Sequence, residues 1–344
     1  MAPKGGARFH FALPGSLQGF QAETGNLRLE NTANVPQPGN RALGLYYDGV
    51  AEGCPGRAAT PTFVPPELAS MGGYELYASP TLYPGQTVRA RLAASSTNSG
   101  AIAFALYLAR YGAGDQLERV YAPAAVLAPG EAREINWQVP DLGGDPIAAV
   151  GIELRSKRRA TGTLYLDFLT WEGAPRVTFT RPAHNGTLWR RAWVNGVDQT
   201  DARAEPFRLM QNAGRGLLIQ GTDEWKDYHV RADVTPHMAA AAGLAGRVQG
   251  MRRYYALLLV HPGKVRLVKM LEGERTLAEA DFRWQFGETH TLALRFAGSW
   301  IEASLDGEAL FALTDENDPL NSGAIALVCE EGRTATQRVE VYRE

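Results

Sequence analysis

Aromatic residues that are accompanied by arginine or lysine are the residues of this chain whose types best suit ligand chemistry. The second half combines Tyr254 and Trp300 with Arg247 and Lys269, and the first half contributes Tyr107. An aromatic ring packs on apolar ring faces, whereas guanidinium and ammonium groups donate hydrogen bonds to the hydroxyl groups around such faces. These five residues are the predicted ligand-binding residues, and sugar recognition is the chemistry that they suit.

Sequence motifs that indicate catalysis are absent. The chain lacks the Glu-x-Asp-x-x-Glu spacing with which retaining glycosidases place an acid and a nucleophile on one strand. The six histidines form neither HExxH nor a close Cys/His cluster, and no Gly-x-Ser-x-Gly, P-loop or GxGxxG motif occurs. The sequence favours a non-catalytic part of a hydrolase and leaves open an active site assembled from distant residues.

The overall charge argues against nucleic acid and membrane partners. Thirty-five basic residues nearly balance 37 acidic ones, and the only basic cluster, Arg155 to Arg159, is expected to be a solvated hairpin loop. No segment has the roughly 20 apolar residues of a membrane span. Cys54 and Cys329 fall in different halves, which predicts no disulfide framework. The sequence favours the cytoplasm and leaves secretion open.

The elements that must position these residues are short strands. Apolar and polar residues alternate between Gly, Pro and Asn, and helical periodicity is nearly absent, which predicts an all-β protein. One apolar stripe runs through alternate positions from Ile102 to Leu108, so Tyr107 is expected on the opposite face. Similar stripes at 150–154 and 164–168 turn Glu153, Arg155 and Asp167 outward, where they face solvent or line a site.

The second half shows the same alternation. Tyr254 and Tyr255 are adjacent, so they should point to opposite faces, with at most one in the core. Arg247 follows a run of small residues that leaves room for a ligand. Trp300 alternates with an apolar stripe and is expected to face away from it. The stripe ends at the hairpin dipeptide Asp306-Gly307.

The chain divides most naturally into two antiparallel β-sandwiches. The segment 175–187 mixes Pro, Gly and Asn and is the predicted linker. It separates a first module at 8–174 from a second at 188–344, and no repeat relates them.

The first module resembles galactose-binding-like jelly rolls in PGNRALGL (38–45), in 74–92 and in the closing GTLYLDFLTWEG (162–173). The resemblance implies a structural calcium ion held by Asp167, with loop carbonyls near Gly39 and Asn40. The early carboxylate that usually completes such a site is missing from FALPGSLQGF. No other cofactor is expected.

The second module resembles concanavalin A-like and laminin-G-like sandwiches of the 3-keto-disaccharide hydrolase type. The similarity lies in DYHVRADV (227–234), the YYAL strand, the Asp-Gly hairpin and SGAIALVCEEG (322–332). The two modules in this order resemble the C-terminal extension of bacterial ADP-ribosylglycohydrolase-related proteins. That resemblance implies an attached catalytic domain outside this chain.

Three functions follow as hypotheses. The first is a lectin-like double module that binds a carbohydrate or ribose-containing ligand for an attached hydrolase. The second is a glycoside hydrolase that acts in the concave face of the second sandwich through Arg247, Tyr254 and a neighbouring carboxylate. The third is a structural or oligomerisation module.

Overall fold

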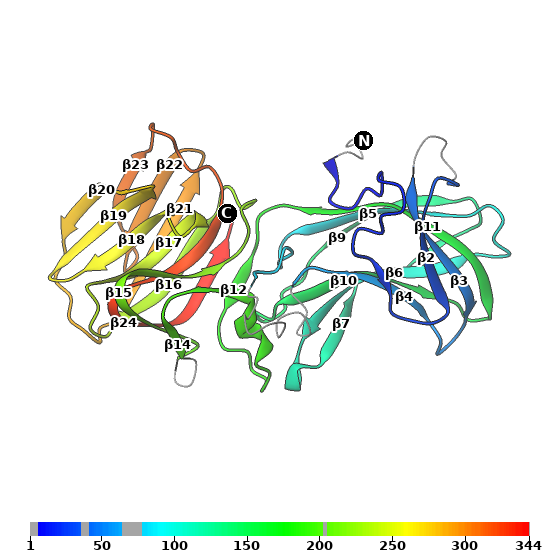
Figure 1. The fold of residues 1–344 in the computed structure, drawn as a ribbon, viewed down its shortest axis with the longest axis horizontal. Helices are drawn as coiled ribbons and strands as arrows, with labels where there is room; N and C mark the ends of the chain where they lie inside the picture. Colours follow the sequence, from blue (N-terminus) through cyan, green and yellow to red (C-terminus); the bar gives the residue numbers. More distant parts are fainter. Residues whose placement is uncertain (1–5, 36–40, 64–77, 202–204, 344) are drawn as a thin grey trace. The chain divides into compact units, whose positions relative to one another are not determined.

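The structure, a computed structural model, describes residues 6–35, 41–63, 78–201 and 205–343, and these form two compact units (Figure 1). Described residues of the first unit are 6–35, 41–63, 86–140 and 147–173. The second unit contains 174–343 together with 78–85 and 141–146, two segments that precede the predicted linker in the sequence. Extended strands dominate both units, and the helical elements in the described residues are short 3-10 turns. The predicted all-β class is confirmed.

Two antiparallel sheets form the first unit (Figure 1). One sheet contains, in spatial order, β1 (Gln21–Ala22), β4 (Gly56–Pro61), β10 (Ile147–Arg155), β6 (Ile102–Tyr111) and β7 (Leu117–Tyr121), with β8 (Ala125–Leu127) also on β6. The other contains β2 (Leu27–Thr32), β3 (Ala42–Val50), β11 (Ala160–Glu172), β5 (Thr87–Ala94) and β9 (Ala132–Gln138). The 156–159 connection therefore links different sheets, so the expected hairpin there is wrong.

The apolar stripe on β6 is buried as predicted, but the stripe on β11 changes face. Leu164 and Leu166 are fully buried, whereas Phe168 is only half-buried and Leu169 and Trp171 take the core positions. The pairing of β11 with β5 shifts register between Leu166 and Phe168. One extra residue at this bulge reverses the alternation beyond it, which a simple two-residue period does not anticipate.

A continuous antiparallel sheet curls into the sandwich of the second unit. Its main path is β20 (Glu274–Asp281), β19 (Lys264–Leu271), β18 (Arg253–Val260), β17 (Ala241–Gly250), β24 (Ala324–Tyr342), β16 (His229–Pro236), β21 (His290–Ala297), β22 (Trp300–Leu305) and β23 (Glu308–Thr314). Off this path are β12 (Val177–Phe179), β13 (Val194–Gly196), β14 (Gln199–Asp201) and β15 (Phe207–Gln220). The predicted Asp306-Gly307 turn joins β22 to β23.

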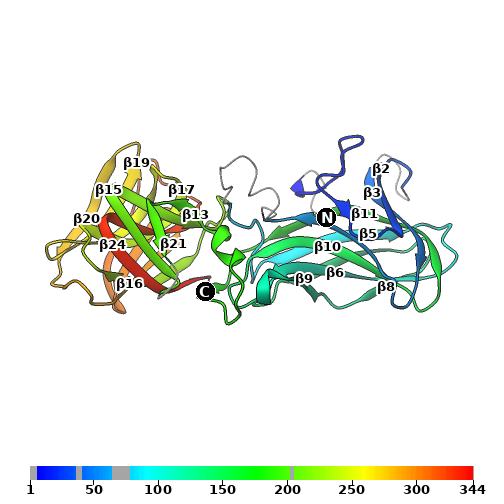
Figure 2. The same cartoon turned by 60° about the horizontal axis from the view of Figure 1, so that its bottom comes forward.

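Strand β24 belongs to both layers of this sandwich (Figure 2). Residues 324–330 pair with β17, and residues 334–342 pair with β16. Gly332 lies between these two stretches with φ 155°, and a Cβ there would approach Met238 O to 1.8 Å. Only glycine fits this crossing point, because any side chain would collide with the neighbouring backbone.

Both faces of β18 are buried. Tyr255 packs on Phe296 of β21 at 5.9 Å between ring centroids, which places it between the layers. Tyr254 lies on the other face in a buried apolar cluster with Leu217, Ala256 and Val268. The expectation that at most one of the two tyrosines is buried is therefore wrong, because this sheet has an apolar cluster on each side.

Candidate ligand-binding face of the first unit

The outward side of the β1-β4-β10-β6-β7 sheet carries an aromatic and charged cluster. Pairing places Glu153 opposite Arg57 on β4, and Tyr107 on β6 opposite Tyr121 on β7. Alternation turns these side chains away from the buried Ile102, Phe104 and Ile152. We call this surface the Glu153 face, and its residues are Arg57, Tyr107, Arg119, Tyr121, Glu153 and Arg155.

Glu153 is the centre of the cluster and is only 2% exposed. One carboxylate oxygen accepts hydrogen bonds from Arg57 Nε and from Tyr121 Oη at 2.8 Å, and the other accepts from Arg155 Nε. Burial alone would raise the pKa of Glu153, but these three donors outweigh it and hold the pKa below its usual range. The carboxylate therefore stays charged and fixes its three neighbours.

The two arginines that bind Glu153 keep hydrogen-bonding capacity for a ligand. Each donates to Glu153 through Nε, and Tyr121, which also binds Glu153, lies within reach of both guanidinium groups. Their side chains are 26% exposed at Arg57 and 46% exposed at Arg155. The Arg155 guanidinium also lies over the Tyr121 ring, 4.6 Å from its centroid. The donors are thus held in fixed positions while they still face solvent.

Tyr107 lies beside this charged centre, on the face predicted for it, but it is fully buried. Its ring covers Gly151, where a Cβ would come within 2.6 Å of the Tyr107 hydroxyl. The Arg119 guanidinium lies 5.6 Å from the centroid of the Tyr107 ring and forms an ion pair with Glu23 at 2.7 Å. Tyr107 therefore serves as the floor of the face and does not project from it.

The Glu153 face suits binding better than catalysis. The middle of the face consists of small residues, so the longer polar side chains on either side project beyond it. These small residues are Ala103, Ala105 and Gly151. A general acid needs a carboxyl that can carry a proton near neutral pH, whereas Glu153 is held ionised by three donors. The face contains three arginines and Glu153, and the adjacent Glu23 pairs with Arg119, which leaves one excess positive charge.

Arg247, a predicted ligand-binding residue, is instead an internal clamp. Its side chain is fully buried over the Phe296 ring, and Nη1 donates to Leu320 O at 2.7 Å. Further donor atoms face Lys226 O and Asp227 Oδ1 at 3.3–3.5 Å. Burial lowers the pKa of Arg247. The room left by its small neighbours is filled by this side chain itself.

Lys269 is a second internal clamp. Its ammonium group donates to Asp315 Oδ2 at 2.6 Å and to the carbonyl oxygens of Asn317 and Asp318. Tyr255 Oη donates to the same Asp315 oxygen at 2.6 Å. Burial would raise the pKa of Asp315, but the hydrogen bonds from Lys269 and Tyr255 lower it below its usual range. Lys269 thus holds the β23–β24 connection in place.

Tyr254 and Trp300 do not converge with these cations. Tyr254 is 1% exposed, and its hydroxyl faces Arg215 Nη1 at 3.4 Å; Arg215 also pairs with Glu274 and Glu330. Arg247 lies on the opposite side of the sheet, against Phe296, so the arrangement expected for a hydrolase does not form. Trp300 faces outward as predicted and is half-buried, with Arg295 5.5 Å from its ring centroid.

Asp167 lies at the β11 bulge and is half-buried. In the part of the chain that the structure describes, no group of three or more His, Cys, Asp or Glu side chains is placed to hold a metal ion. Gly39 and Asn40, the expected carbonyl partners, lie outside the described residues. Because these expected carbonyl ligands are outside the described residues, the calcium site at Asp167 stays a prediction.

Sequence reasoning missed Arg57 and Arg119 as members of the site and offered Tyr121 only as one of several aromatic residues of the first module. Glu153 and Arg155 were placed outward by their alternation, but Arg57 is 96 positions from Glu153 and lies in a segment without a clear stripe. The only available signal was the pair of small residues, Ala105 and Gly151, on adjacent expected strands. Small residues in a strand centre mark a close approach by another group.

No family model matches this sequence. The chain is 30% identical over 152 residues to the urease accessory protein UreF of Mycolicibacterium vanbaalenii, a match that covers 43% of this chain and 67% of that protein. More than half of the chain lies outside the match, so it assigns no family to the two-unit protein. No helix in the described residues is long and apolar enough to span a membrane.

Several solved structures share similarity with part of the chain. The carbohydrate binding module CBM66 from Bacillus subtilis matches 44% of this chain and 95% of its own length, with 15% identity and a TM-score of 0.41. A xylan-binding domain of CBM22 matches 49% of this chain and 96% of its own, with 14% identity and a TM-score of 0.35. A Bacillus subtilis protein of unknown function with a galectin-like fold gives 13% identity and a TM-score of 0.36 over 46% of this chain and 91% of its own.

Proposed function

We propose that the first unit binds a carbohydrate or ribose-containing ligand on the Glu153 face, without catalysis. The observation that carries the proposal is the pair of guanidinium groups, Arg57 and Arg155, that Glu153 fixes through Nε while both side chains stay partly exposed to solvent. Ligand hydroxyl groups accept such hydrogen bonds, and the positions of the donors are fixed before binding, which lowers the entropic cost.

The charge of the face separates two kinds of ligand. A neutral oligosaccharide would use the arginines as hydrogen-bond donors, so its affinity would change little with salt. ADP-ribose carries a pyrophosphate that the excess positive charge attracts, so its affinity would fall as ionic strength rises. As a further part of the proposal, an attached hydrolase domain would be brought by this unit to the polymer or modified protein on which it acts.

Calorimetric titration of the chain tests the proposal. The ligands are oligosaccharides of xylose, glucose and galactose, and ADP-ribose, each at 50 and 300 mM salt. Arg155→Ala removes an exposed donor of the face and should weaken binding about 10- to 100-fold, the effect of losing a hydrogen bond to a charged group. Tyr121→Phe, which removes one donor to Glu153, should weaken it less.

Arg89→Ala is the matched control. Arg89 lies on β5 in the other sheet of the same unit, is 25% exposed and pairs with Glu134 and Glu172. The control should bind like the unchanged chain. No binding of any ligand at millimolar concentration, or equal losses for Arg155→Ala and Arg89→Ala, would contradict the proposal.

A further inference from the structure

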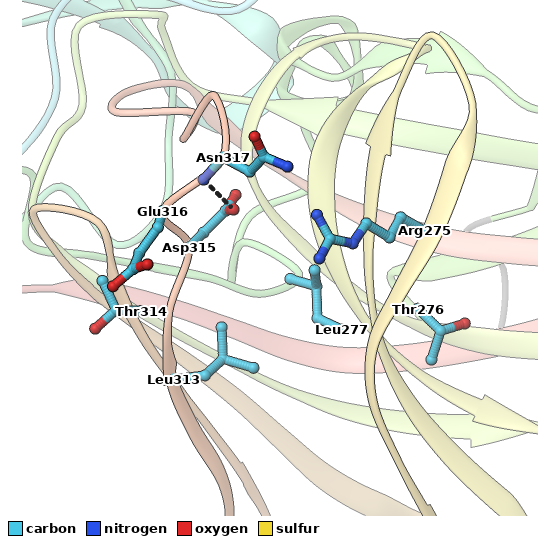
Figure 3. Close-up of a pocket in the computed structure, with 8 residues that line it drawn as sticks. All are labelled: Arg275, Thr276, Leu277, Leu313, Thr314, Asp315, Glu316 and Asn317. Atoms are coloured by element: carbon cyan, nitrogen blue, oxygen red, sulfur yellow. Dashed lines mark hydrogen bonds between the residues drawn. The ribbon is translucent and has the colours of Figure 1, made fainter.

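A hollow of about 540 Å³ opens in the second unit between β20 and the segment that follows β23 (Figure 3). β20 and β23 are the two end strands of the curled sheet, so the hollow lies where its two edges meet. It is separate from the Glu153 face and shares Asp315 with the Lys269 clamp. The lining residues are Arg275, Thr276, Leu277, Leu313, Thr314, Asp315, Glu316 and Asn317.

Arg275 is the cation of this hollow. It is exposed, and the described residues give its guanidinium no hydrogen bond and no ion pair. Its neighbours on the same sheet are paired, since Arg266 binds Glu279 and Arg215 binds Glu274. Figure 3 shows the guanidinium directed across the hollow toward Asp315 and Asn317.

The opposite wall is rigid, and the Asp315 carboxylate in it is neutralised by Lys269. Asp315 is 4% exposed and is held by Lys269, by Tyr255 and by the Asn317 N–H, which donates to Oδ1 at 3.2 Å. The exposed Glu316 adds a carboxylate at the rim, and no contact within the described residues neutralises it. An anionic ligand would meet Glu316, and a cationic ligand would meet Arg275.

A neutral group with hydroxyls satisfies both walls. Its oxygens accept hydrogen bonds from Arg275, and its O–H groups donate to Glu316. Leu277 and Leu313 line the hollow and offer apolar contact to C–H groups (Figure 3). The volume lies within the range of small-ligand pockets. We infer that this hollow is a second saccharide site, which takes one or two neutral sugar units.

This second site is independent of the Glu153 face. We test it by titrating the full chain with neutral methyl glycosides and disaccharides of xylose, glucose and galactose. We expect two sites per chain. Arg275→Ala should abolish or weaken one of them by about 10- to 100-fold, and Leu277→Trp should block the same site by filling the hollow. Arg266→Ala, on the neighbouring strand β19 and paired with Glu279, is the control and should keep both sites.

The two proposals fail in different ways. If Arg155→Ala removes one site and Arg275→Ala the other, both stand. If Arg275→Ala and Leu277→Trp titrate like the unchanged chain, or if the unchanged chain binds none of these sugars at 20 mM, the second site is refuted. If a single site is lost in Arg275→Ala and kept in Arg155→Ala, the hollow stands and the Glu153 face is refuted as a site for neutral sugars, while the titration with ADP-ribose decides its other ligand. Equal melting temperatures of the variants and the unchanged chain separate these results from misfolding.

Discussion

Replacing Glu153 with glutamine should destabilise the first unit by an amount that depends on pH. Glutamine keeps the size of the side chain but removes the charge that binds Arg57, Arg155 and Tyr121. Breaking a fully buried ion pair costs about 3–5 kcal/mol. The two arginines are 26% and 46% exposed, so they rehydrate in part, and solvent screening already weakens their pairing. We therefore expect a loss of about 2 kcal/mol at pH 7.

The direction of the pH effect follows from the pKa of Glu153, which is lower in the folded protein than in the unfolded chain. Stability from this charge is fully present above the unfolded value, about 4.3, and is lost as pH falls through the folded value. The difference between the unchanged chain and Glu153→Gln should thus be largest at pH 7 and shrink toward pH 3.

Scanning calorimetry between pH 7 and pH 3 measures the difference, because it can resolve separate transitions of the two units. The control is Glu134→Gln, which removes a carboxylate that is 37% exposed and pairs with Arg89, and it should cost less than about 0.5 kcal/mol. A Glu153→Gln loss that stays constant with pH, or that equals the control, would refute the account of Glu153 as a charged centre.

Two further substitutions test the packing of the Glu153 face and the clamp of the second unit. Gly151→Ala should cost about 1–3 kcal/mol of unfolding free energy, measured by urea titration, because its Cβ would lie 2.6 Å from Tyr107 Oη and 2.7 Å from Ala58 O. The control is Gly100→Ala, whose Cβ would have no atom within 4 Å and which should leave the unfolding free energy unchanged. Lys269→Met should cost about 3–5 kcal/mol, because it leaves the buried Asp315 without its cation. Lys264→Met, at a side chain that is 41% exposed, is its control, and equal losses at the two lysines would contradict the clamp.

The sequence predicts the all-β fold because each strand carries its own alternation. Ile102, Phe104 and Leu106 are buried as the two-residue period requires, and the Asp306-Gly307 turn follows from local turn chemistry. The period fails where one residue is inserted, as at the β11 bulge, and where a sheet is covered on both sides, as at Tyr254 and Tyr255. Both failures depend on neighbouring strands, which local spacing does not specify.

The candidate site is less predictable, because its members come from separate strands. Alternation correctly turns Tyr107 and Glu153 away from the core, but the register that brings Arg57 and Tyr121 to the same carboxylate is a property of the assembled sheet. Burial is equally nonlocal. Tyr107 faces outward yet is fully covered, because it lies flat over Gly151.

The direction of the donors separates binding cations from structural ones in this protein. Arg247 and Lys269 are buried, and they direct their donors at the carbonyl oxygens of the β23–β24 connection. Arg57 and Arg155 donate to Glu153 through Nε but stay partly exposed, and the guanidinium of Arg275 makes no hydrogen bond or ion pair among the described residues. All five residues look alike in the sequence. A hydroxyl-rich ligand requires hydrogen-bond donors that reach solvent. Arg57, Arg155 and Arg275 are therefore the cations that we expect to bind it.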